Sequence, residues 1–398
     1  MKKLLMISLA TAAFFSNTSF AQSLKFNITG EIEGIQKGDT LHFEKILLPS
    51  FESEPAFDII VDKDGSFKYS GTHPHTQYYA IQYRPAGTPV EDSNKKSIEI
   101  IIKDGNIRIE GRRDYIYYSK VTNSFYDKEF TKIQELSDSL DMAQNMIYNA
   151  MSDKTQDTKI TLELYNKYSS FAADNTNHYK RLETMRKTYG ESAKNEYKAY
   201  ELCTKFTYPL KKLEDGYNEL DHKGKKSYYG TVLNSIIEKL RTLSPDQPAP
   251  DFKLGTRDEG RTVSLADFKG KYLFIYFYGT SYSSIESDRY IVDLYKRNTD
   301  TLEVIGVTES QNMVNQAFDN LIINGSPEMK KGITSMLVHP WKYKVNLDDG
   351  NNRDIVTSYN VTGIPFFILI SPDGKIVARG FFEAFNKANA VLNALSRE

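Results

Sequence analysis

Four hydroxyl side chains, Thr280, Ser281, Ser283 and Ser284, follow an apolar run at residues 272–278 and precede a helical pattern. A serine in such a cluster could act as a nucleophile if a base lay beside it. However, no Gly-x-Ser-x-Gly turn surrounds these serines, and no histidine lies near them in the sequence. Serine also caps helix N-termini through its side-chain oxygen. We therefore predict capping, and not nucleophilic catalysis, for these hydroxyls.

Thiol chemistry is restricted by the cysteine content of the chain. Cys203 is the only cysteine, and a single thiol cannot close a disulfide within the chain. It lies in a stretch with helical spacing, where a small buried side chain is the usual role of cysteine. We predict a buried Cys203, with a mixed disulfide to another protein as the alternative.

Two clusters have side chains that could bind a metal. His73 and His75 flank a proline, but no third ligand is evident, so we predict a surface turn. Residues 348–354 are rich in Asp and Asn, yet they lack the alternating ligands and terminal Glu of an EF-hand. For these we predict a loop and the start of a helix before Tyr359. No phosphate-binding glycine loop occurs, so we expect neither a metal nor a cofactor.

Apolar residues alternate with polar ones in short runs between residues 24 and 116, which is the pattern of β-strands. Asp64-Gly65 and Asp104-Gly105 separate such runs, and Asp-Gly supplies the positive φ of tight hairpins. We predict an antiparallel β-sandwich domain over residues 22–120.

The pattern becomes helical over residues 121–245, where apolar positions such as Ile133, Leu136 and Leu140 are three or four apart and glycine and proline are scarce. Three prolines between Pro245 and Pro250 end this helical region, because proline cannot continue a helix.

Strands and helices alternate in the last region, residues 246–398. Residues 272–278 are nearly all apolar, as in a strand that is covered on both faces. Further strands are predicted at 304–307, 366–370 and 376–378, with helices at 288–295 and 386–395. This order is βαβ followed by a hairpin and a helix.

Four segments of this region resemble the thioredoxin superfamily, in particular the exported ResA/TlpA-like thiol-disulfide oxidoreductases related to AhpC/TSA proteins. They are Ala249-Pro-Asp-Phe-Lys-Leu254, residues 263–271, the strand 273–278 and Val361-Thr-Gly-Ile-Pro365. The match covers about residues 248–397 and implies an α/β thioredoxin-like domain. The β region ahead of it resembles the β domain of unknown function that often precedes such domains.

The resemblance also implies where a Cys-x-x-Cys pair would stand. Tyr282 occupies the nucleophile position and Ile285 the resolving position, and neither side chain can exchange disulfides. A peroxiredoxin-like register would place Thr280 and Ser283 over Thr and Cys, and a serine hydroxyl does not reduce peroxide. Ile364-Pro365 matches the cis-proline loop of the family. We therefore expect no catalytic residue and no turnover.

A binding surface is the remaining role of this face. We predict that Ser281, Tyr282, Ser283, Ser284 and Ile285 form it together with Ile364 and Pro365, and that it binds a peptide or another ligand. The alternative for the loop is that Pro365 only shapes the start of the following strand.

The N-terminus resembles a signal peptide, because Lys2 and Lys3 precede an apolar run that ends in a polar stretch before Ala21. We expect cleavage after residue 21 and a periplasmic or secreted protein. No segment reaches the roughly 20 apolar residues that a spanning helix needs. With 51 basic and 52 acidic residues, the chain is not expected to bind nucleic acid electrostatically.

Three functions follow as hypotheses. The first is an exported, redox-inactive thioredoxin-fold protein that binds or scaffolds an envelope protein or peptide. The second is a participant in periplasmic thiol-disulfide exchange or antioxidant homeostasis that works with an active partner. The third is a structural envelope protein whose β domain and helical region do the binding.

Overall fold

A computed structural model gives the conformation of most of the chain. It describes residues 23–48, 52–88, 97–123, 125–126, 128–151, 158–193, 195–205, 207–257, 260–310, 312, 315–316, 319 and 327–395. The predicted signal peptide, residues 1–21, lies outside these described residues. None of the helices in the described ranges has both the length and the apolar character needed to cross a membrane.

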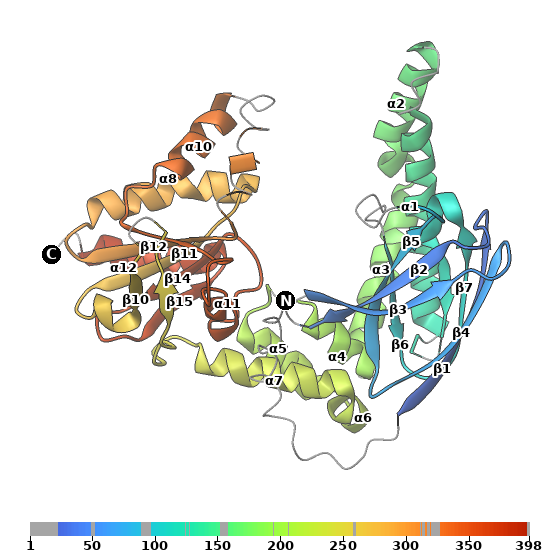
Figure 1. Ribbon diagram of the computed structural model, residues 1–398, viewed down its shortest axis with the longest axis horizontal. Helices are drawn as coiled ribbons and strands as arrows, with labels where there is room; N and C mark the ends of the chain where they lie inside the picture. The colour runs from blue at the N-terminus through green and yellow to red at the C-terminus, as the bar shows by residue number, and fades with distance from the viewer. Residues whose placement is uncertain are drawn as a thin grey trace, which may run out of the picture. The chain divides into compact units, whose positions relative to one another are not determined.

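The chain divides into two compact units, each of which contains helices and a β-rich part (Figure 1). The first unit comprises Met1–Glu201 and Glu219–Thr231, and the second comprises Leu202–Asn218 and Val232–Glu398. The predicted domain limits at residues 120 and 245 remain predictions.

Two four-stranded sheets make up the β-rich part of the first unit, with strand orders β4-β1-β7-β8 and β3-β2-β5-β6. Side chains from both sheets, including Phe26, Leu41 and Ile100, share one buried core. All strand pairs are antiparallel except β1 with β7, which is parallel. Five intervening strands separate β1 from β7, so this pair needs no tight turn. The strands are β1 Leu24–Glu33, β2 Thr40–Leu47, β3 Glu52–Ile60, β4 Ser66–His73, β5 Gln77–Arg84, β6 Ser97–Ile102, β7 Gly105–Arg112 and β8 Lys120–Thr122.

The predicted helical middle region is confirmed. Ile133 and Leu140 are buried and share a core with residues of the next two helices, whereas Leu162 is exposed. The helices are α1 Lys128–Met151, α2 Thr158–Asp174, α3 Thr176–Ser192, α4 Glu196–Cys203, α5 Leu210–Glu219, α6 His222–Lys226 and α7 Tyr228–Thr242.

His73 does not lie in a surface turn, so that prediction was wrong. It is the last residue of β4 and is buried, with its ring 4.9 Å from that of Phe26. Its Nε2–H donates a hydrogen bond to the carbonyl of Lys103 at 2.5 Å. The alternation of β4 continues through this residue and turns its side chain inward. In the described part of the chain, no group of three His, Cys, Asp or Glu side chains could hold a metal ion.

The predicted thioredoxin-like fold of the C-terminal region is confirmed. Its sheet has the order β13-β12-β11-β14-β15, in which β11, β12 and β13 are parallel and β14 and β15 are antiparallel to their neighbours. Residues 348–353 form a turn-rich loop before a short helix, as predicted. The elements are β9 Lys253–Gly255, β10 Thr262–Ser264, β11 Tyr272–Phe277, α8 Tyr282–Arg297, β12 Leu302–Thr308, α10 Pro327–Leu337, β13 Tyr343–Asn346, α11 Asp354–Ser358, β14 Phe366–Ile370, β15 Ile376–Gly380 and α12 Phe382–Leu395.

Strand β11 is buried on both faces, because successive side chains of a strand point to opposite sides. Leu273, Ile275 and Phe277 enter a core shared with β9, β10 and α11. Phe274 and Tyr276 enter a second core, formed with α8, α10 and α12. The two cores hold β11 in place from both sides. The second core also contains Ile285 and so holds the start of α8 against the sheet.

We predict that Gly306→Ala destabilises this domain. A Cβ at Gly306 would lie 2.6 Å from Nε1 of Trp341 and 3.3 Å from the ring of Tyr278. Overpacking of this kind lowers the free energy of unfolding by about 1 to 3 kcal/mol. Urea denaturation followed by the fluorescence of Trp341, which is the only tryptophan and is buried, measures the change.

Gly255→Ala is the matched control, because the nearest atom to its added Cβ is 3.8 Å away. Its denaturation midpoint should stay close to that of the wild type. Equal midpoints for the two variants would contradict the packing described for β12.

Candidate functional site

The turn after β11 leads into the N-terminus of α8, where the predicted hydroxyl cluster forms a cap. Ser281 is the N-cap residue, and its Oγ accepts a hydrogen bond from the N–H of Ser284 at 3.3 Å. The Oγ of Ser284 in turn accepts one from the N–H of Gly279 at 3.2 Å. The Ser281 hydroxyl lies 3.1 Å from that of Ser283 and 3.0 Å from that of Ser284. Ser281 therefore caps α8, as predicted.

In the described part of the chain, these hydroxyls have no activating base beside them. Among the described residues, no histidine or carboxylate side chain forms a hydrogen bond with Ser281, Ser283 or Ser284; these hydroxyls interact with each other and with backbone groups. A serine nucleophile needs a base within about 2.6 to 3.2 Å. The arrangement therefore supports a structural role for the three hydroxyls.

The predicted site residues divide into a buried and an exposed group. Ser284 is fully buried, and its carbonyl accepts a hydrogen bond from the Tyr276 hydroxyl at 3.0 Å. Ile285 is 7% exposed and lies against Gly332 of α10, where an added Cβ would meet its Cγ2 at 2.3 Å. Pro365 is also buried. These residues support the surface from below and offer a ligand little contact area.

The exposed group lies around Ile364, which the fold brings next to the start of α8. A Cβ at Gly279 would meet Cδ1 of Ile364 at 2.4 Å, so this side chain covers the turn after β11. Ile364 is nevertheless 49% exposed, Ser281 is exposed and Ser283 is half-buried. The Ile364–Pro365 peptide bond is cis. The side chain of Tyr282 is outside the described residues, although its backbone begins α8.

The residue before Pro365 is exposed, and its backbone lies outside the pairing of the sheet. Within the described ranges, no backbone hydrogen bond joins the N–H or the carbonyl of Ile364 to another main-chain group. Strand β14 begins two residues later, at Phe366, where it pairs with Phe277 of β11. An extended segment laid along residue 364 would find both a donor and an acceptor.

A buried polar pair below this site was not predicted from the sequence. Nε2–H of His339 donates to Oδ1 of Asp288 at 2.5 Å, and both side chains are almost completely buried. The His339 ring stacks on Trp341 at 4.0 Å and meets Tyr278 edge-on at 5.0 Å. The two partners are 51 positions apart in the chain, and neither belongs to a recognisable motif. Only the second core, which carries α8 over the sheet, brings them together.

Cys203 is buried, as predicted, at the end of α4. Burial raises the pKa of its thiol well above the usual range, so the sulfur stays protonated at neutral pH. A protonated, inaccessible thiol is a poor nucleophile for disulfide exchange.

The C-terminal region is similar in sequence to known thiol-disulfide oxidoreductases. Residues 245–379 match the family described as AhpC/TSA. The chain is 26% identical over 149 residues to "Thiol-disulfide oxidoreductase ResA" of Bacillus subtilis, which covers 37% of this chain and 73% of the relative. It is 28% identical over 151 residues to the protein of that name from Bacillus cereus, covering 37% of this chain and 76% of the relative.

Solved structures were also compared. The solution structure of a thiol:disulfide interchange protein from Bacteroides sp. is 27% identical, with a TM-score of 0.29, and the match covers 38% of this chain and 92% of that one. The C-terminal domain of a putative thiol-disulfide oxidoreductase from Bacteroides thetaiotaomicron is 23% identical, with a TM-score of 0.29 and coverage of 38% and 99%.

We predict that Asp288→Ala destabilises the C-terminal domain strongly. The change leaves the buried Nε2–H of His339 without its acceptor, and breaking a buried pair costs about 3 kcal/mol or more. Chemical denaturation followed by Trp341 fluorescence measures the loss. Glu309→Ala, which breaks an exposed pair with Arg353, is the control and should have a much smaller effect. Similar losses for both variants would show that the buried pair contributes no special stability.

Proposed function

We propose that this protein, whose C-terminal part is similar to the AhpC/TSA family and to ResA thiol-disulfide oxidoreductases, is exported, has no thiol redox activity and binds a peptide or an envelope protein. The binding surface of this proposal is the exposed part of the site around Ser281 and Ile364. The basic and apolar pattern before Ala21 supports export.

One observation carries the proposal: the surroundings of the expected thiol pair are present, but the thiols are replaced. Ile364 covers the turn that leads into α8, next to the cis bond at Pro365. The expected thiol positions hold Tyr282 and Ile285, and Cys203 is buried. Neither replacement can attack or release a disulfide. What the face still offers is the exposed apolar side chain of Ile364, whose backbone pairs with no main-chain group in the described part of the chain.

A role in thiol-disulfide exchange or antioxidant homeostasis, carried out with an active partner, is the second candidate, and family membership favours it. Such a role would have to use contacts and not electron transfer by this chain. The inaccessible Cys203 thiol argues against a mixed disulfide.

The absence of redox activity predicts the result of an insulin-reduction assay. The purified protein, supplied with dithiothreitol, should precipitate insulin no faster than dithiothreitol alone, because no thiol pair is available to turn over. A thioredoxin serves as positive control. Dithiol-dependent acceleration that persists in Cys203→Ser cannot come from that thiol. Such a result would overturn the assignment of a redox-inactive domain, once mass spectrometry has excluded a second protein in the sample.

Peptide binding predicts a specific effect of residue 364. An array of immobilised peptides identifies sequences that the wild-type protein binds, and fluorescence anisotropy measures their dissociation constants. Ile364→Asp should weaken these peptides about tenfold or more, because it places a charge where an apolar contact is expected. Val338→Asp introduces the same charge at an apolar residue that is 71% exposed, and should have little effect. Equal affinities for Ile364→Asp and the wild type would rule out docking at this face.

A further inference from the structure

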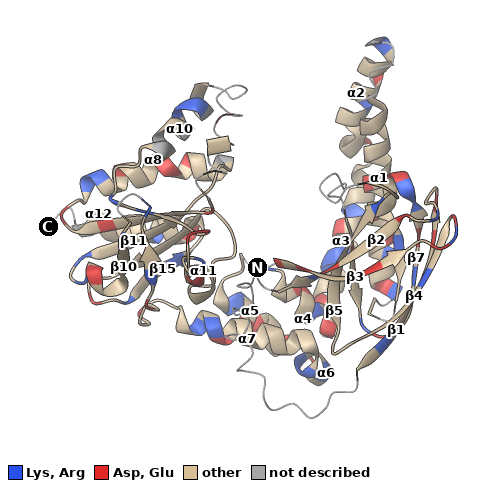
Figure 2. Cartoon of the chain, viewed as in Figure 1, with Lys and Arg blue, Asp and Glu red and all other residues tan. Residues whose placement is uncertain are grey.

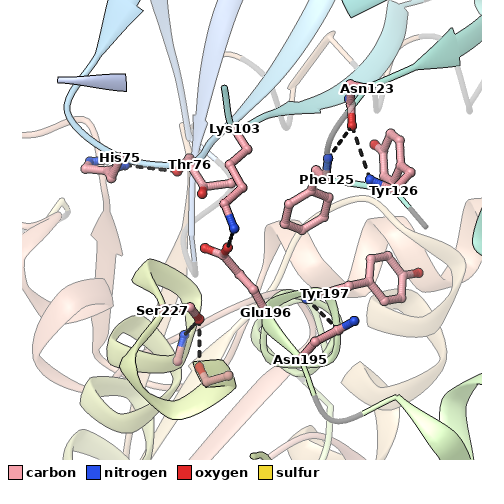
Figure 3. A network of polar contacts seen from close by, with 12 residues as sticks. His75, Thr76, Lys103, Asn123, Phe125, Tyr126, Asn195, Glu196, Tyr197 and Ser227 are labelled. Carbon is pink, nitrogen blue, oxygen red and sulfur yellow. Dashed lines mark hydrogen bonds and ion pairs between the residues drawn. The ribbon is translucent and has the colours of Figure 1, made fainter. Parts of the chain in front are cut away.

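A separate pocket lies within the first unit, far in sequence from the site described above. Its volume is about 670 Å³, which is within the range of small-molecule sites. It is bounded by the turn after β4, the loop between β6 and β7, the start of α4, and the segment that joins α6 to α7 (Figure 3). All of these elements belong to the first unit.

Aromatic rings form much of the wall. The ring of His75 lies parallel to that of Tyr228, with centroids 3.6 Å apart and an angle of 5° between the planes. Nδ1–H of His75 donates to the carbonyl of the buried Thr76 at 2.9 Å, which fixes the orientation of the imidazole. Phe125 and Tyr197 line another part of the pocket. Flat faces of this kind favour a flat, partly apolar ligand.

An ion pair between Lys103 and Glu196 crosses the pocket (Figure 3). Their Nζ and Oε2 atoms are 3.1 Å apart, and the Glu196 side chain is only 12% exposed. Glu196 is the one carboxylate among the residues that line the described pocket. It therefore neutralises Lys103, so the charge of the pocket comes from the two other lysines that line it, Lys223 and Lys226.

The positive charge of the pocket comes from α6, which contributes Lys223 and Lys226. Figure 2 shows this helix to be rich in basic residues. Both are exposed, and no carboxylate in the described part of the chain pairs with either of them. Burial lowers the pKa of His75, so its imidazole is neutral near pH 7. Among the described residues that line the pocket, the two lysines thus leave a net positive charge.

From this combination we infer that the pocket binds a small organic anion, in which a flat ring carries a carboxylate, sulfonate or phosphate group. The ring packs against the aromatic wall of His75, Tyr228 and Phe125, and the anionic group approaches Lys223 and Lys226. Neither part of the site belongs to the thioredoxin-like domain, so this inference does not depend on the proposed function.

A pair of fluorescent probes tests the two parts of the ligand separately in the full-length protein. 8-Anilinonaphthalene-1-sulfonate carries a flat ring system and a sulfonate, whereas N-phenyl-1-naphthylamine has the same ring system without the charge. Replacing Lys223 and Lys226 together by Gln should weaken the sulfonate probe about fivefold or more, and should leave the neutral probe unchanged. Probe molecules bound elsewhere are the same in both proteins and cancel in the comparison.

The matched control replaces Lys180 and Lys187 by Gln. These lysines are exposed on α3 of the same unit, so the change in net charge is identical while the pocket is intact. The sulfonate probe should bind this variant as it binds the wild type. A loss of affinity that equals that of the Lys223 and Lys226 variant would show a general charge effect and overturn the site.

Glu196→Gln provides a test with the opposite sign. The change removes the carboxylate that neutralises Lys103, while the amide oxygen can still accept a hydrogen bond from Nζ. The sulfonate probe should bind this variant about twofold to tenfold more tightly. A misfolded variant would not gain affinity for the charged probe alone. Unchanged sulfonate affinity in both the Glu196 and the double lysine variants would overturn the inference.

Discussion

The burial of β11 on both faces is the constraint on which the C-terminal domain depends. Its six residues direct alternate side chains into two separate cores, so the strand can neither shift by one residue nor tilt without exposing large apolar groups. Its two neighbours, β12 and β14, are fixed by pairing with it. The start of α8 and the residues before β14 then meet at the same end of the sheet, which brings Gly279 against Ile364.

The same constraint explains how the site keeps its shape without thiols. Tyr276 reaches from β11 to the carbonyl of Ser284, and Ile285 packs against α10. Below them, Asp288 holds His339 in the second core. These contacts hold the first two turns of α8 by hydrogen bonding and apolar packing. None of them requires a sulfur atom at position 282 or 285.

The sequence predicted the elements with strong periodicity and missed those with weak local signals. The apolar run at residues 272–278 predicted β11, and the spacing of Ile133, Leu136 and Leu140 predicted the helix α1. Edge strand β13 was missed because its four residues, Tyr343–Asn346, include Lys344 and Asn346 and form no apolar run. His73 was misplaced because the lack of a third metal ligand was read as a surface turn, whereas the strand continues through residue 73.

The site shows the same division between local and distant information. Capping by Ser281 could be predicted, because it depends on residues three positions apart. The burial of Ser284 and Ile285 could not, because it depends on Tyr276 and on α10, which reach these residues only through the tertiary fold. The pairing of Asp288 with His339 is likewise a consequence of packing and has no sequence signature.

The N-terminus of α8 differs from that of a thiol enzyme in the groups that accept hydrogen bonds from its backbone N–H groups. Free N–H groups at a helix N-terminus stabilise an anion, and this is one way in which a cysteine thiolate is maintained. Here the N–H groups of Gly279 and Ser284 donate to the hydroxyls of Ser284 and Ser281. Neutral oxygens of the chain therefore satisfy these two donors, one in the turn before α8 and one in its first turn. The exposed Ile364 beside the start of α8 adds an apolar side chain to this face, and this is the contact that the proposed binding of a polypeptide would use.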